Sequence, residues 1–522
     1  MPFTNYSKQS GILRHGMARS VFGLLLALAL ALFVAWMFRD RISLTVDLSD
    51  ASNSNASNEG PGAGYPTQIY YGLANSIAVL PFKNTNAGGV ANDKSFLAAG
   101  FSESLINQLV KNPKLQVTAA SSAFYFMGRQ GNLPIVAERL RVSHLLVGTI
   151  REGDESIHIT VRLVRVNPDK ELWSDSFDRN YQELPQLRHE ITAAVAAAMH
   201  LERDSGGTVG NLNAEAWLLL LEGRHLLQKS EPESLQRAEA IFYHALEIDP
   251  AFADAWQGLA EIYLDPSWSG AGDKPGHEKA REAARTALEL NPALAGAYVV
   301  QSQIKRAFDW DWQGAREMAQ MALKLRPGSA EVLRNASNNE FTFGNFKTAA
   351  ELFEGAIRRD PVILSHFLGL GLLYEFSGDY DESLVVYRRL LALNPDYPAV
   401  HAYRARVKIA QVKPESALRE ADQETDAFWQ RYARILALSA LERFDEADPL
   451  LDQMIQENAY EAAFQIAEIH AFRGDVDGAF EWLERAYEQR DGGMSEIIGN
   501  QFLADLEDDE RWSSLLSRMG LQ

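Results

Sequence analysis

The stretch FLGLGLLYEFSGDYDESLVVYRRLLALNP, which runs from Phe367 to Pro395, decides how most of this chain folds. Apolar residues recur at helical spacing on both sides of Gly378 and Asp379, so the sequence predicts two helices joined by a tight turn. Ser383 places a small side chain where the two helices must approach each other closely. Pro395 then ends the second helix, because proline lacks the amide hydrogen that a helix interior needs.

The same pattern recurs through the second half of the chain. Five helical stretches end at a proline, and successive prolines are 42, 35, 34 and 34 residues apart, at Pro250, Pro292, Pro327, Pro361 and Pro395. Small residues mark the expected contact within each helix pair, at Ala238, Ala280, Ala315, Ala349, Ser383 and Ala417. The first spacing exceeds 34 by eight residues, which we assign to a loop between Leu264 and Gly276.

A period of 34 residues with a terminal proline resembles the tetratricopeptide repeat (TPR), a helix pair that stacks on its neighbours. The opening stretch carries residues where that family expects them, at Gly371, Tyr374, Gly378, Tyr380 and Tyr387. Small residues continue the pattern at Ala447 and Ala479. The resemblance implies eight helix pairs over residues 211–500, stacked as an all-α, right-handed superhelix, with residues 501–522 as a cap on the last pair.

Residues 75–202 have a different pattern, in which short apolar runs alternate with helical ones. SIAVLPF at 76–82 predicts a buried strand, and residues 94–111 carry apolar side chains at helical spacing. Residues 156–164 alternate strictly between apolar and polar, as in a strand with one buried face. The segment 152–155 joins two alternating runs, which is typical of a hairpin. We therefore predict a compact α/β domain ahead of the repeats.

Five segments within residues 75–202 carry a second resemblance: SIAVLPF, AAGFSESLINQLVKNPKLQV, ASSAFYF, ERLRVSHLLVGTIREGDESIHITVRLVRV and ELWSDSFDRNYQEL. In this order they resemble the TolB-like N-terminal-type domain. In bacterial membrane-bound regulators that domain often precedes TPRs, and a winged-helix, adenylate cyclase or kinase domain often lies before the membrane span. Only twenty residues precede Val21 here, so we expect no cytoplasmic output from this polypeptide alone.

Residues 21–38, VFGLLLALALALFVAWMF, carry no charge over eighteen positions. At about 1.5 Å per residue such a helix spans roughly 27 Å, close to the hydrocarbon thickness of a bilayer. A cleaved signal peptide is the alternative, but the Ala-x-Ala patterns lie inside the apolar run instead of after it. We expect a transmembrane helix, with a cytoplasmic tail at 1–20 and a flexible linker rich in Ser, Asn and Gly at 39–74.

The orientation of this span follows from the charges that flank it. Three basic residues precede it and two follow it, at Lys8, Arg14, Arg19, Arg39 and Arg41. Because cytoplasmic flanks carry the excess of basic residues, this bias favours an N-terminus inside the cell. We expect a single-pass protein of the bacterial inner membrane, with the bulk of the chain in the periplasm.

Composition and motifs argue against catalysis and against nucleic acid as a partner. The absence of cysteine excludes thiolate metal sites, and 50 basic against 70 acidic residues give a net charge of −20, the wrong sign for binding phosphate backbones. HExxH, GxSxG, Walker and Rossmann motifs are all missing. DWDW at 309–312 favours a structural turn with packed indoles, and DVDG at 475–478 lacks the glutamate of a calcium loop. We predict no catalytic residue, cofactor or metal.

The candidate binding residues lie in the fourth repeat. Stacked helix pairs have a concave surface lined by their first helices, and such surfaces commonly bind extended peptides or partner helices. Arg334, Asn335 and Asn338 fall within two turns of one such helix, and Arg334 and Asn338 are four residues apart on one face. Asparagine can pair with a peptide backbone and arginine with a carboxylate. The alternative is that all three are ordinary solvated polar residues.

These features together predict a membrane-anchored, non-catalytic scaffold that binds a protein or peptide in the repeat groove. The alternative is a sensor or regulatory subunit of a signal-transduction or transcription-control system. Such a subunit would act through a separate cytoplasmic partner, as the family resemblance implies.

Overall fold

The computed structural model describes residues 74–86, 96–128, 132–201, 212–268 and 276–521. The predicted tail and transmembrane segment, 1–38, lie outside these ranges, as does nearly all of the predicted linker. Among the described helices, none is both long and apolar enough to cross a bilayer.

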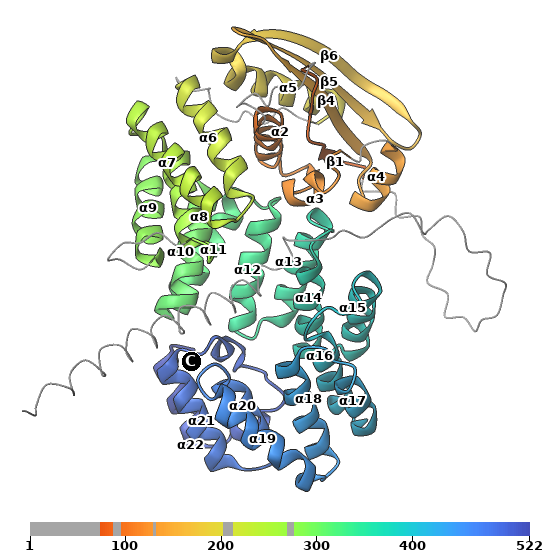
Figure 1. The fold of residues 1–522 in the computed structure, drawn as a ribbon, viewed down its shortest axis with the longest axis vertical. Helices are drawn as coiled ribbons and strands as arrows, with labels where there is room; N and C mark the ends of the chain where they lie inside the picture. Colours follow the sequence, from red (N-terminus) through yellow and green to blue (C-terminus); the bar gives the residue numbers. More distant parts are fainter. Residues whose placement is uncertain (1–73, 87–95, 129–131, 202–211, 269–275, 522) are drawn as a thin grey trace, which may run out of the picture.

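A mixed sheet forms the N-terminal region (Figure 1). Its strands are β1 (Ser76–Val79), β2 (Lys83–Asn84), β3 (Gln116–Val117), β4 (His144–Glu152), β5 (Ser156–Arg165) and β6 (Lys170–Asn180). The order is β3-β1-β4-β5-β6, with β2 beside β4. β1 runs parallel to β3 and β4, whereas β4, β5 and β6 are antiparallel neighbours. The hairpin that residues 152–155 predict joins β4 to β5.

The alternation in β5 determines which face of the sheet is covered. Its apolar side chains are all buried, at Ile157, Ile159, Val161 and Leu163. They pack with the apolar faces of α2 (Phe96–Leu109) and α5 (Leu184–Ala198) in one hydrophobic core. Two shorter helices, α3 (Ala120–Phe124) and α4 (Leu133–Leu140), complete the region. The predicted α/β organisation is confirmed.

Helix pairs make up the rest of the chain, and the described residues contain eight of them. They are α6 (Ala214–Leu227) with α7 (Pro232–Ile248), α8 (Ala253–Leu264) with α9 (Gly276–Leu290), α10 (Ala295–Ile304) with α11 (Trp312–Leu325), α12 (Ala330–Thr342) with α13 (Phe346–Arg359), α14 (Leu364–Phe376) with α15 (Tyr380–Leu393), α16 (Val400–Ala410) with α17 (Pro414–Ala421), α18 (Ala427–Ala440) with α19 (Phe444–Asn458), and α20 (Ala463–Phe472) with α21 (Val476–Gln489).

Small residues allow the two helices of a pair to approach, and serine hydroxyls then join them. Ser302 Oγ donates to the carbonyl oxygen of Ala315 at 2.8 Å. Ser337 Oγ makes the equivalent bond to Ala349 at 2.7 Å. In the next pair the direction is reversed, and Ser383 Oγ of the second helix donates to Gly371 at 2.7 Å. The predicted contact positions are therefore occupied by residues that bring the two backbones within hydrogen-bonding reach.

The proline spacing of 35 residues has a local cause. α10 ends in a π-helical turn, Lys305–Asp309, which accommodates one more residue per turn than an α-helix. Trp310 then takes a left-handed conformation with φ of 58°, and the Asp311 carboxylate accepts a hydrogen bond from Gly314 N to begin α11. The rings of Trp310 and Trp312 lie 5.6 Å apart. DWDW is thus a structural turn with packed indoles, as its position predicts.

The N-terminal region and the first helix pairs share one core instead of forming separate units. α2 lies against α6, where the rings of Phe101 and Trp217 meet edge to face at 6.4 Å. A second contact lies further along the solenoid, where Ser121 Oγ and Ser122 Oγ donate to the two carboxylate oxygens of Asp360 at 2.7 and 2.6 Å. The α/β region therefore bridges the arc from α6 to the α13–α14 loop (Figure 1).

The solenoid curves until its last helices reach its middle. η5 (Gly492–Glu496), η6 (Ala504–Leu506) and α22 (Glu510–Met519) follow the final pair. Arg490 donates to the carbonyl oxygen of Phe308 at 2.7 Å although the two residues are 182 positions apart. The Tyr487 ring lies 5.7 Å from that of Trp310, and η5 contacts α12. α12 thus lies between the α/β region and the C-terminal helices (Figure 1).

Candidate functional site

The first helices of the pairs form the inner face of the solenoid. Successive first helices, such as α8, α10 and α12, contact one another more closely than successive second helices do. That difference places the first helices on the inside of the curve. Side chains of α12 that point away from α13 therefore face the concave side, where the sequence predicts the binding residues.

The three predicted residues of α12 do not share one environment. Arg334 and Asn338 are partly exposed, whereas Asn335 is only 3% exposed. The Asn335 carbonyl oxygen accepts from Asn339 Nδ2 at 2.8 Å, and the same amide donates to Ser302 Oγ of α10 at 3.0 Å. Asn339 thus joins α12 to α10, and the buried Asn335 contributes its backbone oxygen to the same side chain. A ligand on the inner face would meet Arg334 and Asn338.

Several titratable groups of neighbouring helices interact electrostatically with Arg334. Burial, with a smaller contribution from Arg334, lowers the pKa of His366 to about 3, so this imidazole is neutral at physiological pH. Burial also lowers the pKa of Arg306, again with a contribution from Arg334. Glu331 is the acidic neighbour on the same helix, and burial raises its pKa.

A mixed cluster of charges closes the N-terminal end of this face. Arg224 of α6 pairs with Glu261 of α8 at 3.4 Å. Glu103 of α2 accepts from Gln228 Nε2 at 2.6 Å, and burial raises the pKa of Glu103 to about 7. No motif signals this cluster, because Glu103 comes from the α/β region and Gln228 lies 125 residues further along the chain.

A second set of charges lies on the inner face of the later pairs and is almost fully buried. Arg406 of α16 donates through Nε to Glu375 of α14 at 2.9 Å, and through Nη1 to Glu468 of α20 at 2.8 Å. Tyr432 of α18 donates to Glu468 at 2.7 Å. The side chains of Arg406, Glu375 and Glu468 are 4, 1 and 2% exposed. We call these four residues the groove floor.

Burial and pairing act in opposite directions on the groove floor. Burial raises the pKa of Glu375, while Arg406 opposes that shift. The pKa of Arg406 lies well above its usual range, because the neighbouring carboxylates outweigh the cost of its burial. Burial likewise raises the pKa of Tyr432. The floor is therefore a hydrogen-bonded ion network that joins four consecutive first helices.

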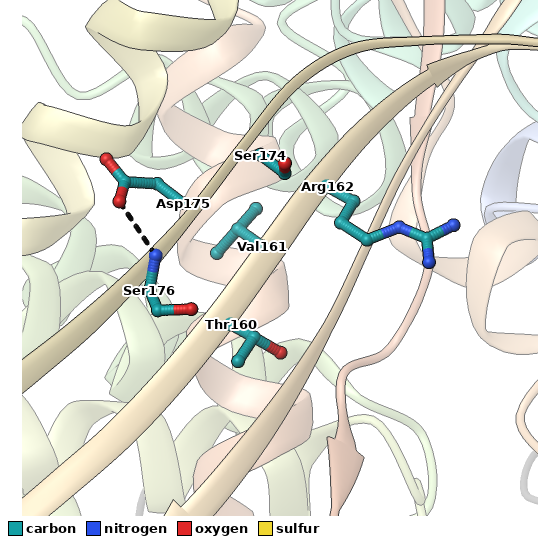
Figure 2. Close-up of a pocket in the computed structure, with 6 residues that line it drawn as sticks. All are labelled: Thr160, Val161, Arg162, Ser174, Asp175 and Ser176. Atoms are coloured by element: carbon teal, nitrogen blue, oxygen red, sulfur yellow. Dashed lines mark hydrogen bonds between the residues drawn. The ribbon is translucent and has the colours of Figure 1, made fainter.

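A shallow hollow lies on the sheet between β5 and β6, lined by Thr160, Val161, Arg162, Ser174, Asp175 and Ser176 (Figure 2). The amide of Ser176 donates to Asp175 Oδ1 at 2.8 Å. Arg162 pairs with Glu171 at 3.3 Å, and both side chains are about half exposed. Charges along β6 are typical of an edge strand protected against pairing. We assign no ligand to this hollow.

The DVDG motif at 475–478 has a structural role. Asp475 of the DVDG segment accepts from Gly478 N at 3.0 Å and from His470 Nδ1 at 2.7 Å, so it begins α21. Among the described residues, no group of three or more His, Asp and Glu side chains is placed to hold a metal ion.

Comparison with known proteins identifies the repeats directly. Models of the tetratricopeptide repeat match residues 367–397 and 432–493. These ranges cover α14 with α15 and α18 to α21, including the pairs beyond the last regularly spaced proline. The expectation that the repeats continue past Pro395 is confirmed.

Three similar proteins differ in how much of each chain is matched. The protein named "Putative adenylate cyclase 3" of Rhizobium meliloti is 28% identical over 38% of this chain and 34% of its own length. Transcriptional regulator HilA of Salmonella typhimurium is 25% identical over 43% of this chain and 41% of its own. The solved structure of Pseudomonas aeruginosa PilF covers 40% of this chain and 93% of its own, with 20% identity and a TM-score of 0.32.

The chain spans about a third to two fifths of the length of these two curated relatives. The repeat matches and the helix pairs establish the fold of the larger part of the molecule. The chain is a mostly helical protein with tetratricopeptide repeats, which are typically non-catalytic protein-interaction modules, behind a small N-terminal sheet region.

Proposed function

We propose that this chain is a non-catalytic scaffold that binds a protein or peptide partner on the inner face of α12. One observation supports the proposal most: Arg334 and Asn338, four residues apart, are both partly exposed on that face, while Asn335 is buried. A guanidinium group donates two parallel hydrogen bonds to a carboxylate, and a carboxamide pairs with a peptide backbone. An acidic extended segment has the matching chemistry.

We further propose that the scaffold is anchored in the bacterial inner membrane by residues 21–38 and acts on the periplasmic side. The support is the uncharged eighteen-residue segment and the basic residues before it. The linker at 39–74 would hold the repeats at a distance from the bilayer.

The second candidate is a regulatory subunit that acts through a separate cytoplasmic partner. The names of two relatives, an adenylate cyclase and a transcriptional regulator, favour this role. The similarity to each covers less than half of its length, so the catalytic or DNA-binding function of those proteins is not transferred to this chain.

The test is mild crosslinking in cells, followed by purification of the full-length chain and mass spectrometry of what is attached. Arg334→Glu combined with Asn338→Ala reverses the charge and removes the amide on the inner face. Gln236→Ala with Arg237→Glu makes the same two changes on exposed positions of α7, a second helix, and serves as the control.

We expect one envelope protein to be enriched with the wild type and the control, and its capture to fall at least about tenfold with the α12 variant. That loss corresponds to about 1.4 kcal/mol of binding free energy. Equal capture by all three proteins would refute the α12 site. Capture of a cytoplasmic regulator, dependent on residues 21–38, would support the second candidate instead.

A further inference from the structure

The groove floor is covered by a short segment of the chain itself. Residues 499–503, which we call the strap, lie between η5 and η6. Asn500 Nδ2 donates to Glu468 Oε1 at 2.8 Å, and Gln501 Nε2 donates to Glu375 Oε1 at 3.1 Å. The Phe502 ring lies 4.7 Å from Cζ of Arg406. Each charged residue of the floor is therefore met by a different side chain of the strap.

Local interactions hold the strap in the shape that this contact needs. The Asn500 side-chain oxygen accepts from Phe502 N at 3.0 Å, and Tyr380 Oη donates to Gln501 Oε1 at 3.3 Å. Gly499 has φ of +70°, and a Cβ there would lie 2.6 Å from the ring of Phe346. The side-chain NH2 groups of Asn500 and Gln501 thus donate to the groove floor, while their side-chain oxygens accept hydrogen bonds from Phe502 N and Tyr380 Oη.

The strap does not use the whole hydrogen-bonding capacity of the floor. Glu375 Oε2 and Arg406 Nη2 are buried and have no hydrogen-bond partner among the described residues. A buried acceptor and a buried donor without partners each cost free energy. The groove floor can therefore form more hydrogen bonds than the strap makes with it. A recognition site that can accept other ligands would have this property.

We propose that the groove floor is a peptide-recognition site for two neighbouring carboxamides followed by an aromatic ring, and that the chain occupies it in cis with the strap. The carboxylates of Glu375 and Glu468 select the two amide donors, and Arg406 selects the ring. This site is separate from the inner face of α12. The later repeats therefore bind the chain's own C-terminal segment, while Arg334 and Asn338 of α12 stay partly exposed.

The test uses the full-length chain with Asn500→Asp and Gln501→Glu. Both changes preserve size and keep the oxygens that accept from Phe502 N and Tyr380 Oη. They remove the amide donors and place new carboxylates against Glu468 and Glu375. The control, Asn394→Asp with Gln423→Glu, adds the same charges away from the floor, at partly exposed and exposed positions.

Two measurements are made on each protein. Hydrogen exchange reports whether the strap leaves the floor. Fluorescence polarisation reports binding of a labelled synthetic peptide with the sequence of residues 495–506, SEIIGNQFLADL, and of a second peptide with Asp and Glu in place of the two amides.

We expect strap amides in the variant to exchange at least about tenfold faster than in the wild type and the control. The amide peptide should bind the variant at least tenfold more tightly than the Asp–Glu peptide, and should not bind the wild type. Three outcomes would overturn the proposal. They are unchanged hydrogen exchange of the strap in the variant, no binding of the amide peptide to a variant whose strap is released, and equal binding of both peptides. If the double variant does not fold, Gln501→Glu alone decides by the same criteria.

Discussion

Arg406 connects four first helices of the solenoid through one guanidinium group. Its carboxylate partners, Glu375 and Glu468, are nearly as inaccessible to water as it is. A buried ion pair contributes little net stability when intact, because desolvation offsets attraction. Removing one partner is costly, however, because the remaining charge stays buried without compensation.

Arg406→Met is therefore expected to lower the free energy of unfolding by about 3–5 kcal/mol at pH 8. The loss should shrink as the pH falls. In the variant the two carboxylates are buried without a cation, so their folded-state pKa values lie above those of the unfolded chain. The folded variant then binds protons more tightly and gains stability as the pH decreases.

Urea unfolding at pH 8 and pH 5.5 measures both effects. Arg434→Met is the control, because Arg434 makes a half-exposed ion pair with Asp422, and such pairs contribute about 0–1 kcal/mol. An equal loss from both variants would show that the buried network does not stabilise the later repeats.

Gly371 shows how closely the helices of one pair approach. A Cβ at this position would lie 2.1 Å from the ring of Tyr387, which is fully buried. At Gly355, also within a helix, the nearest atom would lie at an ordinary 3.4 Å. Both glycines have helical backbone conformation, and they differ in the space available for a Cβ atom.

Gly371→Ala is expected to destabilise the chain by about 1–3 kcal/mol, because the tyrosine ring must move out of a packed core. Gly355→Ala is expected to be neutral or stabilising by up to about 1 kcal/mol, since alanine is the better helix former. Chemical unfolding of both variants provides the comparison. A greater loss at Gly355 would contradict the packing described here.

At the scale of elements, the residue before the repeat proline has two different roles. In most repeats it closes a local turn: Asp249 and Asn394 accept from the amide two residues on, at 3.1 and 3.2 Å. Asp360 instead accepts from two serines of α3. The same position in the repeat thus becomes the docking point for the α/β region.

Asp360→Ala should release α3 and increase hydrogen exchange at residues 119–124 at least about tenfold. Both serines lose a charged acceptor, and hydrogen bonds to charged groups contribute about 1.5–3 kcal/mol each. Asp249→Ala is the control, because it removes only a local turn. Exchange at 119–124 that is the same in both variants would refute the docking role of Asp360.

Prolines and small residues were sufficient to predict the helix pairs, because both act locally. A proline after a helical stretch commonly ends the helix, although Pro449 lies inside α19. A small residue is needed where two helices approach closely. The π-helical turn at 305–309 left only one trace, the spacing of 35 residues. The strap left none, since Asn500 and Gln501 lie in an irregular segment without periodicity and find their partners on helices distant in sequence.

At the scale of the whole molecule, the α/β region and the C-terminal segments both pack against the repeats. The α/β region contacts α6 and Asp360. In the C-terminal part of the chain, η5 contacts α12 and the strap contacts the later repeats. Sequence predicted a cap for the last pair, and α22 does pair with α21 through Arg511 and Asp477 at 2.9 Å. Residues 499–503 also contact the groove floor. This contact depends on the curvature of all eight helix pairs, and no local sequence pattern encodes that curvature.

These contacts of the α/β region and the C-terminal segments limit where a partner can bind. Of the three residues that the sequence predicts in the groove, two are partly exposed and one is buried. Residues four apart share a helix face, and Asn335 does not lie on it. The central claim is that the inner face of α12 contacts the partner directly.

Photocrosslinking from single positions tests that claim most directly. A photoreactive amino acid replaces Asn338 in one full-length protein and Gln236, on α7, in another, and both are irradiated in cells. We predict a discrete adduct with one partner protein from position 338 and none with that protein from position 236. An adduct of the same protein from both positions, or from position 236 alone, would contradict the account.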